Sequence, residues 1–562
     1  LAMIVLVDLL IIFLTNSIRV GSVIVPFVLF IFAVVVCVVY EFRGIPMMAP
    51  DILTVQTATS VMGNYTFKLT FEQYSVILVC MAFFFTFLRL HEIKVTEKRV
   101  FHIAGFIVVA LGCGLFTNQI ILSDFMEEHQ INIRMFRPME SYQKYGGVLT
   151  FARSVGYAVV KKPEGYSTAK VDQIIQEYEK KSANAQQSTA KQYPNIITVV
   201  NETFADIKVL GDFKTNEDYM PYFHSLKKNC VTGYTYASIV GGQTANTEFE
   251  LLTGNTLGFL SAGTTAFQLY IHGQMPSLVS NLKAEGYSGN KAMHPFNPYN
   301  YNRPAVYKDF GFTDFIDKFD FPKNVKRVRE YISDEANVDR IISEYEQNRK
   351  KTDQPFYMYN MTIQNHSPYD KDAANFKQSI KIESSKYDAE ANRYLNLIKY
   401  SDDSLKQLTS YFEKCKEPTI ILFLGDHHPR LTDEFMNKIT NGKYQTWSSE
   451  QMMKRYQVPF VIWANYDIKE QHIEKTSMNY MQSILTQTAG VKMTGYQRFL
   501  NEVRKEVPTI TSQGYWGKNG KFYQINDKGS PYYGIIQKYR MIQYNMMFDK
   551  KNRRDSFFEV SK

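Results

Sequence analysis

Long apolar runs are concentrated at the beginning of the chain. Two of them approach the length needed to cross a hydrocarbon core of about 30 Å, and two are shorter. The alternative is that these runs are core helices of a soluble protein. Such helices would need polar residues on the side that faces water, and these runs have almost none. The pattern therefore predicts a bundle of transmembrane helices over residues 1–123. The runs are 1–15, 23–40, 75–87 and 103–122.

Basic residues give this region an orientation. Arg89, Lys94, Lys98 and Arg99 lie between the third and fourth runs, and positive charge marks cytoplasmic loops. The fourth run then leads outward, so everything after residue 123 is expected outside the cell. The chain starts inside an apolar run without Met, and counting backwards predicts one further helix upstream. We therefore expect five spans in a multi-pass cell-membrane protein, with no cleavable signal visible.

Residues 124–192 are polar and helical in character, and we expect them to form a linker. The triplet Ala183-Asn184-Ala185 in this linker resembles a signal-peptidase site. It lacks the apolar core that normally precedes such a site. Cleavage there and an intact linker both remain open.

Short apolar runs that follow the linker predict a different architecture. Continuous runs of this kind are typical of strands buried on both faces of a sheet. Helical stretches such as 384–413 separate them, so the pattern predicts an α/β domain with a central, mostly parallel sheet. We expect this domain to span 193–506, with 507–562 as a small C-terminal subdomain. The predicted strands are 196–200, 356–361, 419–424 and 458–463.

Three of the predicted strands end in residues that can do chemistry. Glu202 follows the first, His366 follows the second, and Asp426-His427 follows the third. In open α/β sheets ligands bind at the carboxyl ends of strands, so these side chains are expected to converge. Two carboxylates and an imidazole would suit a divalent metal ion. The other interpretation is that Asp426-His427 belongs to a polar turn with no ligand.

A second candidate segment runs from Gly241-Gly242 to Leu251. A helix is expected to begin at Thr244 or Thr247, with Phe249 and Leu252 on its buried face. The N-terminus of a helix favours phosphate, and a threonine hydroxyl coordinated to a metal there would become a nucleophile. Alternatively the threonine only caps the helix, because 247–250 fits a capping box. Judged from the residue types alone, the capping role is favoured over the nucleophile.

Composition sharpens this picture at three points. The mean hydropathy of −0.26 and the net charge of +9 look soluble and weakly basic. The first 123 residues hold seven Lys/Arg and six Asp/Glu, so the basic excess belongs to the external part. It forms no arginine-rich cluster, which argues against nucleic acid as a partner and favours anionic lipid headgroups.

Five cysteines exclude a disulfide scaffold. Cys230 and Cys415 lie outside the apolar runs, and pairing or two free thiols are both open.

The order and spacing of these motifs resemble one known family. The chain resembles the lipoteichoic acid synthase family of membrane phosphoglycerol transferases, within the alkaline phosphatase and sulfatase superfamily. The resemblance implies a transmembrane helix bundle followed by an extracellular sulfatase-like domain. The segments that carry it are Asn201-Glu202, the stretch 241–249 around Thr244, Gln364-Asn365-His366-Ser367-Pro368, Gly425-Asp426-His427 and 539–545.

The resemblance also implies roles for individual residues. Thr244 matches the nucleophile, His366 the histidine that contacts glycerophosphate, and Arg303 the arginine that contacts phosphate. Tyr301 stands where the family often has tryptophan and would pack on glycerol, and His294 would line the pocket. The implied cofactor is one divalent cation, usually manganese, with magnesium or zinc as alternatives. Its implied ligands are Glu202, Thr244, Asp426 and His427.

The implied reaction is a two-step transfer. Thr244 attacks phosphatidylglycerol, diacylglycerol leaves, and a hydroxyl of an acceptor glycan or polyglycerol phosphate chain takes the glycerophosphate in a Gram-positive-type envelope. The acceptor stays open, because Tyr301 and the loop 296–300 depart from the family pattern. A sulfatase reaction is excluded, since residues 243–246 lack a Cys-x-Pro-x-Arg-like motif. A phosphoethanolamine transferase, usually rich in disulfides, a phosphodiester hydrolase and a non-enzymatic glycan-binding membrane protein are the alternatives.

Overall fold

The computed structural model divides the chain into two compact units. The first is Leu1–Val160 with Ser261–Thr264, and the second is Lys161–Leu260 with Thr265–Lys562. The Ala183-Asn184-Ala185 triplet lies outside the described residues, as does most of the expected external loop at 44–71. The structure describes residues 1–43, 46–49, 52, 71–89, 91–123, 125–129, 131, 138–155, 160, 162–182, 192–261, 264–298, 300–383 and 386–560.

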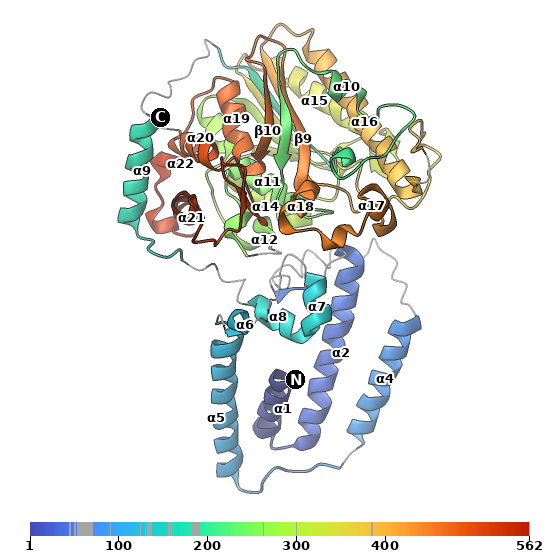
Figure 1. Ribbon diagram of the computed structural model, residues 1–562, viewed down its shortest axis with the longest axis vertical. Helices are drawn as coiled ribbons and strands as arrows, with labels where there is room; N and C mark the ends of the chain where they lie inside the picture. Colours follow the sequence, from blue (N-terminus) through green and yellow to red (C-terminus); the bar gives the residue numbers. More distant parts are fainter. Residues whose placement is uncertain are drawn as a thin grey trace. The chain divides into compact units, whose positions relative to one another are not determined.

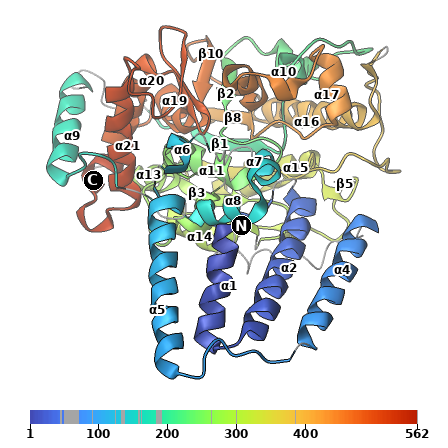
Figure 2. The same ribbon diagram turned by 60° about the horizontal axis from the view of Figure 1, so that its bottom comes forward.

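Long apolar helices form most of the first unit as far as it is described. They coincide with the predicted runs, and they lie side by side (Figure 2). Helix α1 packs against α2 and α5, and α2 packs against α4. Two stretches, Ile18–Tyr40 and Arg99–Ile121, are long and apolar enough to cross a membrane, and the other two helices are shorter. The four are α1 (Ala2–Thr15), α2 (Ile18–Arg43), α4 (Phe71–Leu88) and α5 (Arg99–Phe116), which a π-helical turn continues over Thr117–Ile121.

The polar segment that follows is divided between the two units. Helices α6 (Phe125–Glu128), α7 (Pro138–Tyr145) and α8 (Gly147–Val155) belong to the first. Helix α9 (Thr168–Ser182) belongs to the second, where it packs against α20 (Gly495–Glu506) and α21 (Tyr533–Met547). Ion pairs support this packing: Asp172 with Arg554 at 2.6 Å and Glu177 with Lys538 at 2.7 Å.

A central sheet organises the second unit, and eight strands of the described chain belong to it. Every neighbouring pair is parallel except those of β9, which is antiparallel to both its neighbours. The predicted α/β fold with a mostly parallel sheet is confirmed. In order across the sheet the strands are β10 (Gln471–Ser477), β2 (Cys230–Tyr236), β9 (Gln457–Ala464), β8 (Thr419–Gly425), β1 (Asn195–Asn201), β7 (Phe356–Met361), β3 (Ser288–Met293) and β4 (Asp314–Ile316).

Helices cover both faces of this sheet (Figure 1). Alternate residues of β1 point to opposite faces, so Ile197 packs in one core and Ile196 in the other. The Ile197 core includes side chains of α15 (Asp334–Arg349), α16 (Ala389–Phe412) and α17 (Asp433–Ile439). The Ile196 core includes side chains of α11 (Thr244–Thr253), α13 (Leu278–Ala284), α14 (Arg303–Phe310), α19 (Met481–Thr488), α20 and α21.

The residues after 506 share the second of these cores. Ile510, Tyr515 and Ile536 are fully buried there with Leu485 and Phe499. Each such side chain contributes about 1.5–3 kcal/mol by leaving water. The elements of this segment are β11 (Thr509–Thr511), β12 (Gly514–Trp516), β13 (Phe522–Tyr523), α21 and α22 (Asp555–Phe558). The remaining short elements of the unit are α10 (Pro221–Ser225), α12 (Ala266–Leu269), β5 (Arg327–Val328), β6 (Tyr331–Ile332) and α18 (Ser449–Met452).

Candidate active site

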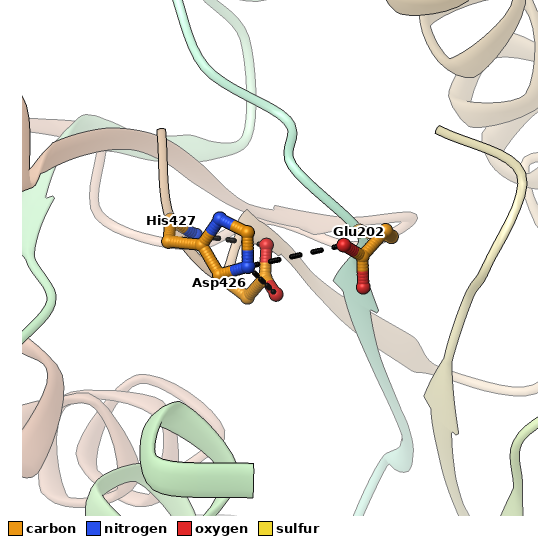
Figure 3. A group of neighbouring side chains, drawn as sticks. All are labelled: Glu202, Asp426 and His427. Atoms are coloured by element: carbon orange, nitrogen blue, oxygen red, sulfur yellow. Dashed lines mark hydrogen bonds and ion pairs between the residues drawn. The ribbon is translucent and has the colours of Figure 1, made fainter. Parts of the chain in front are cut away.

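Strands β8, β1 and β7 are adjacent and parallel, so their carboxyl ends meet at one edge of the sheet. Glu202, Asp426 and His427 come together there, with ligand atoms all within 4.8 Å of one another (Figure 3). His427 Nε2 lies 3.8 Å from Glu202 Oε1 and 3.2 Å from Asp426 Oδ2. All three side chains are buried. The residues that follow two separate strands therefore form one acidic pocket with a single imidazole.

A close contact between two loops produces this convergence. A Cβ atom on Gly425 would lie 1.8 Å from the carbonyl oxygen of Phe204, so only glycine fits. The loop after β1 also orients both acids. The Thr203 backbone N–H donates to Asp426 Oδ1 at 2.6 Å, and the Thr203 hydroxyl donates to Glu202 Oε1 at 2.8 Å. The two carboxylates are thus held toward each other by backbone geometry and short hydrogen bonds.

The pocket contains polar atoms that lack a partner. Asp426 Oδ2 and His427 Nε2 are buried, and no described residue hydrogen-bonds to them. His427 Nδ1 lies 2.9 Å from the carbonyl oxygen of His428, which can only accept, so Nδ1 carries the proton. Nε2 therefore presents a lone pair to a carboxyl oxygen of Asp426, and while Asp426 is ionised this contact is unfavourable unless a cation lies between them. The donor set fits a divalent ion such as manganese, magnesium or zinc.

The electrostatics of the pocket favour the same conclusion. Burial raises the pKa of Glu202, and the nearby charge of Asp426 raises it further. Burial raises the pKa of Asp426 to about 7, against hydrogen bonds from Thr203 and Thr244 that lower it. Burial lowers the pKa of His427, so its imidazole is neutral and ready to act as a ligand. Without a cation, the two carboxyl groups are therefore costly to ionise.

Thr244 is the first residue of α11, and its hydroxyl faces the two acids. The hydroxyl donates to Glu202 Oε2 at 3.4 Å. The cap position is Gln243, whose side chain makes no capping hydrogen bond. Thr247 lies inside the helix, and its hydroxyl donates to the Asp426 carbonyl at 2.9 Å. The capping interpretation of this segment is therefore wrong, because both hydroxyls bond to residues after other strands.

The backbone before α11 is left-handed for three residues in succession. Gly241, Gly242 and Gln243 have φ values of 71°, 145° and 66°. The Gly241 N–H donates to the His428 carbonyl at 3.0 Å, which fastens this turn to the loop after β8. A non-glycine residue at Gly242 would be strained at its φ. The turn places the start of α11, and with it the Thr244 hydroxyl, beside Glu202, and the N-terminus of a helix favours an anion.

Arg303 begins α14 and is almost completely buried. Its Nε and Nη2 donate to Glu248 Oε1 at 3.0 and 2.7 Å. Glu248 Oε2 accepts from the hydroxyls of Tyr307 and Tyr359. Because Nε and Nη2 bond to Glu248, the Nη1 edge of the guanidinium is directed away from this carboxylate. The ring of Tyr301 lies 5.1 Å from this guanidinium, a cation–π contact.

The two predicted pocket histidines are fixed by backbone carbonyls. His294 is buried, and its Nδ1 lies 2.9 Å from the Met361 carbonyl oxygen. Burial and then the charge of Arg303 hold the pKa of His294 well below its ordinary value. His366 is half-buried, and its Nδ1 lies 2.7 Å from the Ser367 carbonyl oxygen. In its neutral form His366 therefore keeps an unprotonated Nε2. A positive charge on His366 lowers the pKa of both Glu202 and His427.

The roles of several residues at this site were not anticipated from the sequence. Thr203 orients both acids, Thr247 ties α11 to β8, and Glu248 holds Arg303. Asn365 donates from Nδ2 to the Glu202 carbonyl at 3.0 Å and to Ser401 Oγ at 2.8 Å. The available signal was position: Thr203 and Asn365 directly flank the predicted ligand and histidine, and Thr247 and Glu248 lie one helical turn after Thr244.

Comparison with known proteins places this geometry in a family. The model of the sulfatase family matches residues 194–491, which is more than half of the chain. The chain belongs to the sulfatase family. The matched region contains every strand of the central sheet and all the candidate site residues. Membership in the sulfatase family establishes the fold class of the matched region.

Curated relatives of this sulfatase-family chain match only part of their own length. The putative cyclic beta-1,2-glucan modification protein of Rhizobium meliloti is 30% identical over 433 residues, covering 76% of this chain and 65% of the relative. The lipoteichoic acid synthase-like YvgJ of Bacillus subtilis is 26% identical over 278 residues, covering 48% of this chain and 42% of the relative. The chain thus spans between about two fifths and two thirds of these proteins.

A solved structure shares the fold. The Streptococcus pyogenes phosphoglycerol transferase GacH, in complex with sn-glycerol-1-phosphate, aligns with a TM-score of 0.57. The alignment covers 72% of this chain and 100% of that chain at 21% sequence identity. At this identity the likeness supports the fold, and the site chemistry depends on the residues described above.

Proposed function

We propose that this chain is a metal-dependent phosphoglycerol transferase that moves glycerol phosphate from phosphatidylglycerol to a hydroxyl of an acceptor glycan. One observation carries the proposal. A threonine hydroxyl at a helix N-terminus faces two buried carboxylates and a neutral imidazole, and Asp426 Oδ2 and His427 Nε2 lack hydrogen-bond partners among the described residues. That combination activates an alkoxide nucleophile and receives a phosphodiester. Glu202, Thr244, Asp426 and His427 would hold the cation, which would lower the pKa of the threonine hydroxyl and offset negative charge.

In the first half of the reaction the Thr244 oxygen attacks the phosphorus of phosphatidylglycerol. The bond between phosphorus and the diacylglycerol oxygen breaks, and that oxygen takes a proton from protonated His366 as diacylglycerol leaves. The Nη1 group of Arg303 and the N–H groups of α11 bind the phosphate oxygens. A glycerophospho-threonine remains on the enzyme.

In the second half an acceptor hydroxyl attacks the same phosphorus. His366 is now neutral, and its unprotonated Nε2 accepts the hydroxyl proton. The bond from phosphorus to Thr244 breaks, the threonine oxygen is released, and glycerol phosphate is left on the acceptor. One histidine thus serves as acid and then as base, because its Nδ1 proton is occupied by the Ser367 carbonyl throughout.

The acceptor and the location follow from the relatives and from the first unit. A relative named for glucan modification matches more of this chain than those named for lipoteichoic acid synthesis, which supports a glycan acceptor over a polyglycerol phosphate chain. The apolar helices support a multi-pass protein at a cell membrane, where a lipid donor is available. The charge pattern of 89–99 supports an extracellular catalytic unit.

A phosphoethanolamine donor is less well supported. Members of that related group usually carry several disulfides in the soluble domain. Here all five cysteines, each in the described part of the chain, are free thiols, including Cys230 and Cys415. Cys230 and Cys415, whose pairing the sequence leaves open, are both free thiols in the structure. The donor test below includes phosphatidylethanolamine so that this alternative is measured directly.

The decisive experiment follows diacylglycerol release from headgroup-labelled phosphatidylglycerol by the full chain in detergent with Mn²⁺. We expect Thr244→Ala to abolish release and to lose the labelled protein adduct. Thr253→Ala is the matched control, because it removes a hydroxyl from the opposite end of α11 that bonds only within its own segment. Retained release by Thr244→Ala would refute the covalent route, and faster release from phosphatidylethanolamine would refute the donor.

A further inference from the structure

The loop that carries His366 is held by a single arginine. Residues 362–369 leave β7, and three of their backbone carbonyls point to the guanidinium of Arg329. Nη2 donates to the carbonyl oxygens of Gln364 and His366, each at 2.8 Å, and Nη1 donates to that of Pro368 at 2.6 Å. The loop therefore closes around one planar group whose donors are fixed relative to one another.

The position of Arg329 in its own hairpin is unusual. It occupies the turn between β5 and β6 and has a φ of 56°, a left-handed conformation that costs a non-glycine residue about 1–2 kcal/mol. A charged turn residue normally points to solvent, yet Arg329 is only 8% exposed. Asn375 Nδ2 donates to its carbonyl at 2.9 Å, which holds the turn in this conformation. Backbone strain here serves to direct the guanidinium inward.

The charge of Arg329 is balanced in an unusual way. Among the residues that the structure describes, no carboxylate forms an ion pair with it. Instead the guanidinium lies 5.3 Å from the ring of Tyr331 and 5.7 Å from the ring of Tyr369. Both rings are attached to the same loop: Tyr369 donates to the Asn365 carbonyl at 2.8 Å, and Tyr331 donates to the Ser367 carbonyl at 3.3 Å. Carbonyls and aromatic faces together form a socket for one guanidinium.

We propose that Arg329 is a positioning residue of the transferase, which fixes the His366 loop so that Nε2 of His366 is directed at the reacting phosphodiester. The proposal rests on the proposed function. The two carbonyls that surround the His366 ring have separate donors: His366 Nδ1 bonds to the Ser367 carbonyl, and Arg329 bonds to the carbonyl of His366 itself. The ring orientation therefore depends on the loop path that Arg329 sets. A shift of about 1 Å at a catalytic group costs on the order of 100-fold in rate.

The metal pocket has its own supports, so the two effects can be separated. The carboxylates of Glu202 and Asp426 are held by Thr203 and by the loop after β8, and none of these residues bonds to Arg329. The 362–369 loop contacts Glu202 at its backbone: the Glu202 N–H donates to Thr362 Oγ1 at 3.0 Å, and Asn365 Nδ2 donates to the Glu202 carbonyl at 3.0 Å. Loss of Arg329 should thus slow proton transfer while leaving the affinity for Mn²⁺ unchanged. A residue needed only for folding would affect both.

The test is chemical rescue of Arg329→Gly in the full chain. Glycine accepts the φ of 56°, and the substitution leaves a socket shaped for guanidinium. We expect kcat to fall by about 100-fold, with the KM for phosphatidylglycerol and the Mn²⁺ affinity within about threefold of wild type. Guanidinium chloride at tens of millimolar should restore at least one order of magnitude in kcat. Arg327→Gly, in the same hairpin with an exposed side chain, is the control and should show neither effect.

Two results would overturn the proposal. The first is wild-type kcat in Arg329→Gly, and the second is a loss of kcat that guanidinium does not restore or that comes with weakened Mn²⁺ binding. Each protein is also assayed with bis(4-nitrophenyl) phosphate, a soluble phosphodiester. If wild type cleaves only this substrate, the lipid donor of the proposed function is refuted while rescue of Arg329→Gly is still measured. If wild type cleaves neither substrate, both proposals are refuted.

Discussion

Replacing Asp426 with asparagine should stabilise the metal-free form of the second unit, called the catalytic unit here because it contains the candidate site, while destroying its function. Asp426 is buried beside Glu202, and asparagine removes its charge without changing its shape. The Oδ1 atom that accepts from Thr203 and His427 is retained. The new amide would take the place of Oδ2 and donate to His427 Nε2, which is 3.2 Å away and has no partner. An unfavourable contact thus becomes a hydrogen bond.

The size of the effect follows from the pKa. Burial raises the pKa of Asp426 from 3.8 to about 7, and about three pKa units correspond to about 4 kcal/mol. Because the folded pKa is raised, this group favours folding at low pH and loses that contribution as pH rises through about 7. The metal-free wild type therefore carries the full cost at pH 8. At pH 5 Asp426 is protonated in the folded state, and the difference falls below about 2 kcal/mol.

Tryptophan fluorescence during heating gives the assay. All three tryptophans, Trp447, Trp463 and Trp516, lie in the catalytic unit, so the signal reports this unit alone. For a unit of about 400 residues, 4 kcal/mol corresponds to about 5 °C in Tm. In chelator at pH 8 we expect Asp426→Asn to melt about 5 °C above wild type, and the gap to narrow at pH 5. Mn²⁺ should raise the Tm of wild type and leave that of the variant unchanged.

The result that would refute this reasoning is specific. If Asp426→Asn melts at or below wild type in chelator at pH 8, the carboxylate is not costly in the folded state. If the gap is the same at pH 5 and pH 8, charge is not its cause. If Mn²⁺ stabilises the variant as much as the wild type, Asp426 is not a ligand.

Three further predictions follow from the same contacts. Glu248→Gln should lower the free energy of unfolding by about 3–5 kcal/mol in denaturant titrations, because Arg303 is left as a buried charge. The double variant Glu248→Leu with Arg303→Met should recover this stability but remain inactive. Gly425→Ala should abolish Mn²⁺ binding in calorimetry, since its Cβ would lie 1.8 Å from the Phe204 carbonyl oxygen; unchanged affinity would contradict the loop contact. The Mn²⁺ affinity of wild type should fall up to about tenfold per pH unit below about 7, as a proton competes at Asp426; a flat profile would show that Asp426 is ionised without metal.

Strands buried on both faces along their whole length could be predicted, because a continuous run of apolar residues indicates such burial directly. β1, β7 and β8 are apolar at nearly every position, and their parallel pairing brings the residues after them to one edge. Four strands of the central sheet, β2, β3, β4 and β10, were missed, and β2 and β3 show why. Their segments contain glycine and polar residues, and pairing with a neighbour fixes them as strands. A local pattern predicts a strand only where burial is on both faces.

Contacts between residues far apart in the sequence limit how much of the site could be predicted. Local physics gave Thr247 a capping role, because nothing in residues 244–250 indicates the Asp426 carbonyl that its hydroxyl reaches. Glu248 and Arg303 are 55 residues apart, and the need for a buried countercharge appears only once both are inside. The proposed metal ligands could be predicted as a cluster because they follow strands, whereas the residues that hold them follow no such rule.

One face of α11 links the parts of the site. Thr244, Thr247 and Glu248 lie at positions i, i+3 and i+4, so they share a side of the helix. The first faces the acids, the second fastens the helix to the loop after β8, and the third holds Arg303. Glu248 has its positive partner in Arg303, whereas no described Lys or Arg pairs with Glu202 or Asp426. Under the proposed function, Arg303 would therefore be positioned by folding alone, and Thr244 would become active only when the metal binds.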